Sequence, residues 1–472
     1  MNIYVMMIVA ALAIGCIGYM LIKKMDIKIT LLAVGIVLMY IAIVAGQGIS
    51  MKGFESSGIS LLDPIFAVVE QFKATLPAAG FIILMLGGYS AYMSAIGAND
   101  VTVSVMTKPL KKIKSVYVLV PVVFILGNVL SLVIPSASNL AIILLATLYP
   151  ILRSAGMSRL TIGAIIATSA TIVPTPLGGD NVAIVEELVK LPQYAGLTVT
   201  EYVFKHHALV SIPTIVFMAA LHYFWQKYMD KKQTVTAVKE EEVKSEVKEI
   251  KGSFLYKLVY AILPLFPIFI LLATYAVQMT TGVTINIGVE LATLISFILA
   301  IVCELIRHKG SSKVLATTQK FFDGMGNSIS IVALLVAASV FVTGLKSIGL
   351  IDALQGAMTG LNGSGMGFVL PLILVGVTAL IVILSGSGVA LFYAMVPLMV
   401  PLAEAAGINP YAVTIPMGLA GNLLRAVSPV AAVIIIIAGT TKDNPMDIIK
   451  RTSVPMIGGT IFMFILSMMV FL

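Results

Sequence analysis

One arginine within an apolar stretch is the residue of this sequence best placed to bind a ligand. Arg425 lies inside the apolar segment 410–440, and an arginine at the centre of a bilayer costs roughly 2.5–3.5 kcal/mol even on insertion scales. A guanidinium group binds a carboxylate through two parallel hydrogen bonds, so Arg425 predicts a site for an anion. The alternative is an internal ion pair with Asp180, and the two arrangements can alternate.

Four polar interruptions of apolar segments, at 135–139, 174–181, 385–388 and 422–429, would break a membrane helix. Such a break is tolerated at membrane depth only where protein or a water-filled cavity satisfies the freed backbone groups. Half-helix N-termini at these breaks present N–H groups and positive dipole ends, which suit a carboxylate. We therefore expect the breaks to enclose an anionic substrate; kinks filled by neighbouring helices are the alternative. The expected binding residues are Arg425, Ser136, Ser138, Asn139, Thr175, Ser385, Gly386, Ser387, Gly388, Asn422 and Ser428.

Asp180 is the acid of the second interruption and has three candidate roles. It can carry a proton, bind sodium together with carbonyls of the break, or cap a helix that begins at Val182. We expect Asp180 and Asn181 to form the ion-coupling site, with H⁺ or Na⁺ as the coupling ion. A sodium ion near Asp180 is the one metal that this pattern allows, and no cofactor is expected.

The composition sets the class of protein that must position these residues. Of the 472 residues, 59% are hydrophobic and 11% charged, with a mean hydropathy of +1.06, whereas soluble proteins are about 45–50% apolar and about 25% charged. This small number of charged residues cannot cover a surface that faces water. We therefore predict an all-α polytopic membrane protein with the lipid bilayer as its main partner. The net charge of +8 therefore indicates no nucleic-acid partner.

Ten apolar segments are long enough to cross a membrane, which takes about 20 residues. Two further apolar segments, 116–154 and 366–405, are too long for one span and carry a small-residue break, so we predict re-entrant hairpins. The ten predicted crossings are 3–22, 27–46, 77–97, 159–190, 203–226, 254–278, 285–305, 325–345, 410–440 and 449–471.

Positive charge gives the predicted orientation. Most of the 30 lysines and arginines fall on one face of this topology, and such residues are retained on the cytoplasmic side. We therefore expect both termini to lie outside the cell. The charged segment 229–253 is predicted to be a cytoplasmic linker, and the apolar stretch 1–20 a retained first span.

The two halves of the chain repeat the same pattern. Residues 95–100 match 347–352, and 136–138 match 385–387. Five crossings per half is an odd number, so the second copy must be inverted, with the breaks at mid-membrane, as in secondary transporters. The predicted repeats are 1–228, with scaffold spans 3–97, hairpin 116–154 and broken span 159–190, and 254–472, with scaffold spans 254–345, hairpin 366–405 and broken span 410–440.

Several local sequences resemble one transporter family, the anaerobic four-carbon dicarboxylate carriers of the Dcu C type, within the ion transporter superfamily. The similar segments are 88–93, 96–100, 222–228, Ser-Gly-Ser-Gly at 385–388, 392–394, 407–410, Asn422, Arg425, Ser428 with Pro429, and 450–455. The resemblance implies an inner-membrane carrier for succinate, fumarate and malate, largely exporting succinate with proton coupling. It also suggests an elevator motion, and we expect a homodimer. The sequence departs from the family pattern at Val389, Leu424, Ala426 and Asn139.

These observations favour an alternating-access carrier over other classes of protein. An ion-coupled carrier for an amino acid or another organic anion is the nearest alternative, and a passive anion channel is an alternative of another class. A membrane-embedded enzyme would need clustered acids, bases or metal ligands at depth, where this sequence offers only Asp180 and Arg425. We therefore expect no enzymatic activity.

Overall fold

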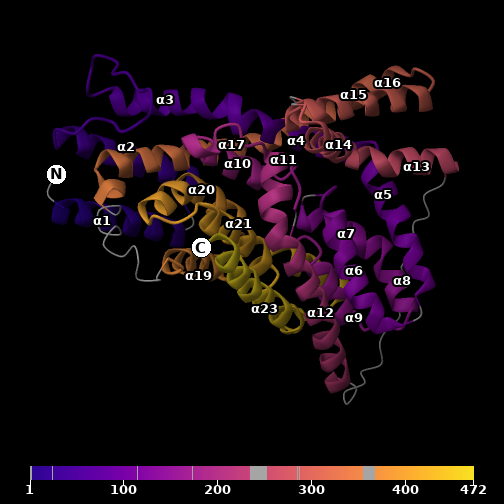
Figure 1. Cartoon of the computed structure of the whole chain (residues 1–472). Helices are drawn as coiled ribbons and strands as arrows, with labels where there is room; N and C mark the ends of the chain where they lie inside the picture. Colours follow the sequence, from indigo (N-terminus) through magenta and orange to yellow (C-terminus); the bar gives the residue numbers. More distant parts are fainter. Residues whose placement is uncertain are drawn as a thin grey trace.

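The computed structural model describes residues 3–23, 25–113, 115–134, 136–172, 174–233, 252–283, 285, 287–353 and 367–472. Within these ranges the regular structure is helical, without strands (Figure 1). Most of the predicted linker, residues 234–251, lies outside the described residues, and α12 continues into its first residues. The first-half helices are α1 (Ile3–Ile22), α2 (Ile27–Val44), α3 (Asp63–Thr75), η1 (Leu76–Gly80), α4 (Phe81–Ala95), α5 (Ala98–Thr107), η2 (Lys108–Lys112), α6 (Val116–Leu130), α7 (Ala137–Thr147), α8 (Tyr149–Ser154), α9 (Arg159–Ala167), α10 (Gly179–Leu188), η3 (Pro192–Tyr194), α11 (Val199–Glu201), η4 (Tyr202–His207) and α12 (Ala208–Gln233). The second-half helices are α13 (Phe254–Ile262), η5 (Leu263–Leu265), α14 (Phe266–Thr281), α15 (Val289–Arg307), α16 (Ser312–Thr317), α17 (Gln319–Ser347), α19 (Val369–Ser385), α20 (Val389–Ala405), α21 (Tyr411–Arg425), α22 (Ala432–Thr441) and α23 (Pro445–Phe471).

The prediction of a multi-pass membrane protein is confirmed. Seven helical stretches among the described residues are long and apolar enough to cross a membrane. The predicted crossings 159–190 and 410–440 are instead pairs of short helices, α9 with α10 and α21 with α22. With nine residues, α9 is about 14 Å long at 1.5 Å per residue, too short to cross alone. The seven candidate spans are Ile27–Val44, Asp63–Ala95, Val199–Lys232, Phe254–Thr281, Val289–Arg307, Ser312–Ser347 and Pro445–Phe471.

The third predicted span begins earlier in the structure than the sequence suggested. We expected it at 77–97, but α3, η1 and α4 run together from Asp63, with a kink at Ala78. The carboxylate of Asp63 accepts hydrogen bonds from the hydroxyls of Ser56 and Ser57 and from the Ser57 N–H. These bonds fix the loop that enters α3.

Close helix packing around α17 builds one part of the molecule. This helix contacts α2, α3 and α4, and glycines permit the approach. A Cβ built on Gly35 would lie 2.8 Å from Phe341 Cα, and one built on Gly324 would lie 2.5 Å from the Gly87 carbonyl oxygen. We call the helices of the predicted scaffold spans 3–97 and 254–345 the scaffold helices; they are α1 to α4 and α13 to α17.

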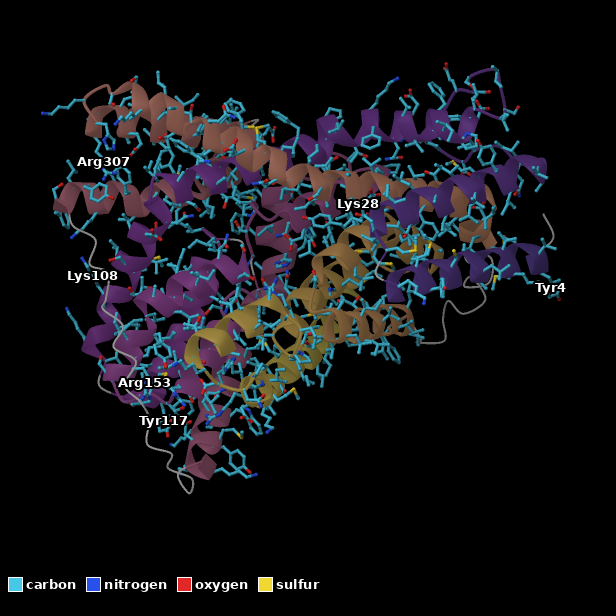
Figure 2. All side chains as sticks on the ribbon, turned by 180° about the vertical axis from the view of Figure 1, so that it is seen from behind. Tyr4, Lys28, Lys108, Tyr117, Arg153 and Arg307 are labelled. Atoms are coloured by element: carbon cyan, nitrogen blue, oxygen red, sulfur yellow. The ribbon has the colours of Figure 1, made fainter. Side chains whose placement is uncertain are left out.

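A second part contains the breaks. Here α12 packs along α23, and both contact α9. In Figure 1, α6 to α9 lie on one side of the α12–α23 pair and α19 to α21 on the other. Figure 2, from behind, shows Lys108, Arg153 and Arg307 toward the side of the molecule opposite to Tyr4.

Candidate anion-binding site

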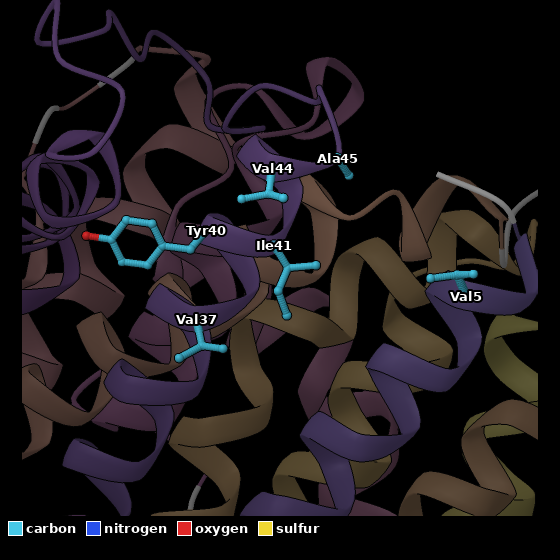
Figure 3. A pocket seen from close by; sticks show the side chains of 6 residues that line it. All are labelled: Val5, Val37, Tyr40, Ile41, Val44 and Ala45. Atoms are coloured by element: carbon cyan, nitrogen blue, oxygen red, sulfur yellow. The ribbon is translucent and has the colours of Figure 1, made fainter.

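An open pocket in the described part of the chain is not suited to an anion. A pocket of about 430 Å³ lies between α1 and α2, lined by Val5, Val37, Tyr40, Ile41, Val44 and Ala45 (Figure 3). Its lining is apolar, and the Tyr40 hydroxyl donates to the Leu61 carbonyl. The search for an anion site therefore turns to the breaks.

Arg425 connects the two broken helix pairs. We call residues 168–178, between α9 and α10, the first break, and residues 426–431, between α21 and α22, the second break. Arg425 is the last residue of α21, in the second half of the chain, and is half-buried. Its Nη2 donates to the carbonyl oxygen of Ala170, in the first break, at 2.7 Å, and its Nη1 reaches Asn422 Oδ1 at 3.5 Å. Among the described residues Arg425 forms no ion pair with Asp180. The guanidinium is thus bound to a neutral carbonyl, a partner that a carboxylate can replace with a stronger, charge-assisted bond.

A buried asparagine, which the sequence analysis missed, holds the first break together. Asn128 on α6 accepts hydrogen bonds from the N–H groups of Thr171 and Ile172, each at 3.1 Å, through Oδ1. Its Nδ2 donates to the carbonyl of Thr168 at 3.3 Å and to that of Phe124 at 2.9 Å. The bonds to Thr168, Thr171 and Ile172 pair backbone groups that have no partner within a helix beyond the end of α9. An amide in an otherwise apolar helix, next to Gly127, was the available signal.

The second predicted hairpin lies directly on the second break. Ser428 is fully buried and donates to the Ile383 carbonyl at 2.7 Å. Gly386 has φ +75°, and a Cβ built there would lie 2.7 Å from the backbone of Val430 and Ala431. A Cβ on Gly388 would lie 2.8 Å from the backbone of Gly421. This tip therefore requires glycines, because backbone meets backbone.

The serines of that tip form a local turn. The Ser385 hydroxyl donates to the Ser387 carbonyl at 3.2 Å and accepts from the Ser387 N–H at 3.4 Å. Helix α20, which has 17 residues, begins directly after Gly388. The free N–H groups at the N-terminus of α20 therefore lie at the tip that packs on the second break.

The first predicted tip is less closely connected to Arg425. Ser136 caps α7 by accepting from the Asn139 N–H at 3.4 Å. Ser136 and Asn139 are exposed and Ser138 is half-buried. Within the described residues, the hydrogen bonds of this tip stay in α7, and none reaches Arg425. The structure thus brings the residues of the second tip onto the Arg425 break but does not bond the first tip to it.

Asp180 and Asn181 stand at the beginning of α10. The helix begins at Gly179, so Asp180 lies in its first turn, and the alternative that Asp180 caps a helix starting at Val182 is wrong. Asn181 Nδ2 donates to the Thr175 carbonyl at 2.9 Å, and the Thr175 hydroxyl accepts from the Leu177 N–H at 3.2 Å. Thr175 and Asn181 are both buried. They shape the turn that precedes α10.

A tyrosine of the second half lies beside the turn that carries Asp180. A Cβ built on Gly179, the residue before Asp180, would lie 2.8 Å from Tyr393 Oη of α20. Asp180 Oδ1 accepts from the Asn181 N–H at 3.0 Å. Among the residues that the structure describes, Asp180 forms no ion pair.

A second arginine is more deeply buried than Arg425. Arg451 on α23 is 1% exposed and forms an ion pair with Asp230 of α12 at 2.6 Å. Its Nη1 also donates to Thr161 Oγ1 at 3.0 Å and to Gln226 Oε1 at 3.3 Å. The sequence analysis counted this arginine among the cytoplasmic charges. It missed the burial because α23 begins at Pro445, so Arg451 lies nearly two turns inside the helix.

Comparisons with known proteins show the family to which the chain belongs. The family model described as "C4-dicarboxylate anaerobic carrier", DcuC, matches residues 3–472. The chain is 35% identical over 436 residues to the anaerobic C4-dicarboxylate transporter DcuC of Escherichia coli K12, covering 91% of this chain and 89% of that one. It is 35% identical over 453 residues to the probable DcuC of Vibrio cholerae, covering 96% and 95%.

Two solved transporters share the fold. The YdaH transporter of Alcanivorax borkumensis aligns with a TM-score of 0.63 at 14% identity, covering 94% of this chain and 98% of that one. MtrF of Neisseria gonorrhoeae, described with a class of antimetabolite efflux pumps, aligns with a TM-score of 0.64 at 15% identity, covering 94% and 95%. The resemblance read from the sequence is thus confirmed over almost the whole chain, which belongs to the DcuC family of anaerobic C4-dicarboxylate carriers.

Proposed function

We propose that this protein is a secondary active transporter of C4-dicarboxylates, with succinate, fumarate and malate as substrates and succinate export as its main task. The observation that carries the proposal is the bond from Arg425 to the Ala170 carbonyl across the two breaks. A substrate carboxylate takes the place of that carbonyl on the guanidinium. The names of the relatives from Escherichia coli and Vibrio cholerae support the choice of a four-carbon diacid.

The second carboxylate of the substrate is assigned to the N-terminal N–H groups of α20, at the Ser385–Gly388 tip. This tip packs on the break that follows Arg425. A helix N-terminus favours an anion. Asn422, one turn before Arg425, supplies a further amide. Ser136, Ser138 and Asn139 approach the substrate from the first tip in another state of the cycle.

The transport motion is proposed to be an elevator movement between inverted repeats. The order of elements supports the repeats: in each half two consecutive helices precede a broken helix pair, α6 and α7 before α9–α10 and α19 and α20 before α21–α22. Contacts are also reciprocal, because α7 packs on α22 and α20 packs on α10. In this proposal the hairpins and broken helices move as one unit against the scaffold helices.

The proposed orientation has both termini outside the cell and the linker in the cytoplasm. Lys108, Arg153 and Arg307, which the positive-inside rule assigns to the cytoplasm, lie toward the side away from Tyr4 (Figure 2). The carrier is proposed to act as a homodimer in the bacterial inner membrane.

Asp180 is proposed to be the coupling residue, with a proton as the coupling ion. Asp180 follows Gly179, which Tyr393 of α20 approaches closely, and among the described residues its carboxyl group pairs with no cation. An intramembrane carboxyl group of this kind suits a role in proton transfer. A proton bound here neutralises the carboxylate while the diacid is carried. Sodium remains the competing ion, and separate proton and sodium gradients distinguish the two.

Exchange of labelled succinate by reconstituted protein tests the proposed function. Arg425→Ala is expected to abolish exchange, and Arg425→Lys to retain a small part, because a lysine keeps the charge but not the two-bond fork. Arg153→Ala, at the half-buried C-terminal end of α8, where Nη1 donates to the Met157 carbonyl, is the matched control and should exchange like wild type. Unlabelled amino acids should not compete. Wild-type exchange by Arg425→Ala, or competition by amino acids but not by diacids, would refute the assignment.

A further inference from the structure

A chain of hydrogen bonds leads from the Arg425 break to a histidine that the proposed function does not use. His222 of α12 is fully buried, and its Nε2 lies 3.2 Å from Thr168 Oγ1, at the end of α9. Thr168 is bonded through its carbonyl to Asn128, which also holds Thr171 and Ile172 beside the Ala170 carbonyl that Arg425 binds. His222 is therefore connected to the first break by one hydrogen bond, to Thr168.

The other ring nitrogen faces an amide whose orientation is fixed. Gln226 Nε2 lies 3.4 Å from His222 Nδ1 and donates to the Arg451 carbonyl at 2.9 Å. Gln226 Oε1 accepts from Arg451 Nη1 at 3.3 Å. A guanidinium can only donate, so Oε1 must face Arg451 and the NH₂ group must face His222.

These partners select one form of the imidazole. Because the Gln226 NH₂ group donates, His222 Nδ1 must accept and carries no proton. The proton of the neutral ring is then on Nε2, which donates to Thr168 Oγ1. That hydroxyl in turn donates to the Ala164 or Ile165 carbonyl, each at 3.0 Å. All of these bonds are satisfied by the uncharged Nε2–H tautomer.

A second proton on the ring conflicts with this network. A proton on Nδ1 would point at the Gln226 NH₂ group, so two donors would face each other. Turning the amide would offer Oε1 to the ring but would bring the NH₂ group against the Arg451 guanidinium. Protonation of His222 and the bond between Gln226 and Arg451 therefore exclude each other.

The surroundings of His222 contain one charged pair. From α6 the ring meets Phe124, with ring centroids 4.8 Å apart, and from α9 it meets Thr168. From α23, through Gln226, it meets Arg451, which is paired with Asp230 of α12. Arg451 and Asp230 are the charged groups among the described residues of this network. They are connected to the His222 ring through the side-chain amide of Gln226.

We propose that His222 is a second proton-binding site of the carrier, filled when Gln226 turns away from Arg451. The proposal rests on the proposed function, because its role there is to couple proton binding to the state of the Arg425 break. When a substrate carboxylate replaces the Ala170 carbonyl on Arg425, the break is released and the bond from Thr168 to His222 changes with it. The hydrogen bonds of this structure fit the state in which His222 is neutral.

Transport by His222→Gln in vesicles tests the coupling. Exchange of labelled for unlabelled succinate at equal pH needs no net proton movement, whereas accumulation driven by a pH gradient does. We expect the variant to retain exchange and to lose accumulation, so that internal succinate never exceeds external succinate. His207→Gln, which changes another buried histidine at the start of the same helical stretch, is the matched control and should keep both. Accumulation by His222→Gln at the wild-type level would overturn the proposal, while absence of exchange by wild type would refute the proposed function instead.

A spectroscopic measurement decides the case even where a variant folds poorly or wild type exchanges no diacid. Replacing His206, His207 and His308 by Gln leaves His222 as the sole histidine of the four, and its ring nitrogens can be followed by nitrogen-15 NMR. We expect the neutral Nε2–H tautomer at alkaline pH and a doubly protonated ring at acid pH. Gln226→Glu should shift this titration to higher pH, because a carboxylate accepts from the protonated ring. A ring that stays neutral throughout, in both backgrounds, would overturn the proposal.

Discussion

Replacing Asn128 by leucine should collapse the first break without changing the apolar packing volume much. The substitution leaves the N–H groups of Thr171 and Ile172 without the acceptor they have now. A buried polar group without a partner costs about 1–3 kcal/mol, so the two together predict a loss of about 2–6 kcal/mol in the free energy of unfolding. Asn128→Asp keeps the acceptor oxygen and should lose less of that stability.

Denaturation of the purified protein in detergent measures this effect, with Asn327→Leu on the exposed face of α17 as the control. Succinate exchange should also fall in Asn128→Leu, because the Ala170 carbonyl lies between the bonds that Asn128 makes. The reasoning would be refuted if Asn128→Leu were as stable as Asn327→Leu and exchanged succinate like wild type.

Three further substitutions test separate parts of the site. Gly386→Val places a side chain against the backbone of Val430 and Ala431 at a positive φ, so succinate exchange should be lost, and unchanged exchange would contradict the close approach. Arg451→Met leaves the half-buried carboxylate of Asp230 without the Arg451 cation and should destabilise the protein by about 3–5 kcal/mol. Adding Asp230→Leu should recover most of the loss; equal stability of the single and double variants in denaturation would contradict this. Asp180→Asn should retain exchange and lose ion-driven accumulation, and accumulation like wild type would remove Asp180 from the coupling site.

The sequence predicted those features that depend on residue type within an apolar background. Arg425 and the breaks were recognisable because charge and proline or glycine are rare at membrane depth. The predicted interruptions 174–181 and 422–429 overlap the breaks of the structure but do not coincide with them, because α9 and α10 are separated by 168–178 and α21 and α22 by 426–431. The family was also recognisable, because its short segments are spread over much of the chain.

Features that depend on tertiary contacts were not predictable in the same way. Helix α3 was missed because Glu70, Gln71 and Lys73 lower its hydropathy, and Pro77 suggested a boundary that the structure bridges. Asn128 was missed because its role is to bond backbone groups 40 and more residues away. The same holds for Arg451, whose partner Asp230 lies 221 residues earlier in the chain.

Equilibrium binding of labelled succinate to the purified protein tests the central claim most directly. The account assigns one substrate carboxylate to the Arg425 guanidinium, in place of the Ala170 carbonyl. Hydrogen bonds to charged groups contribute about 1.5–3 kcal/mol each, so Arg425→Ala should weaken succinate binding by at least about tenfold, with Arg153→Ala unchanged. Equal affinity of wild type and Arg425→Ala for succinate would contradict the account.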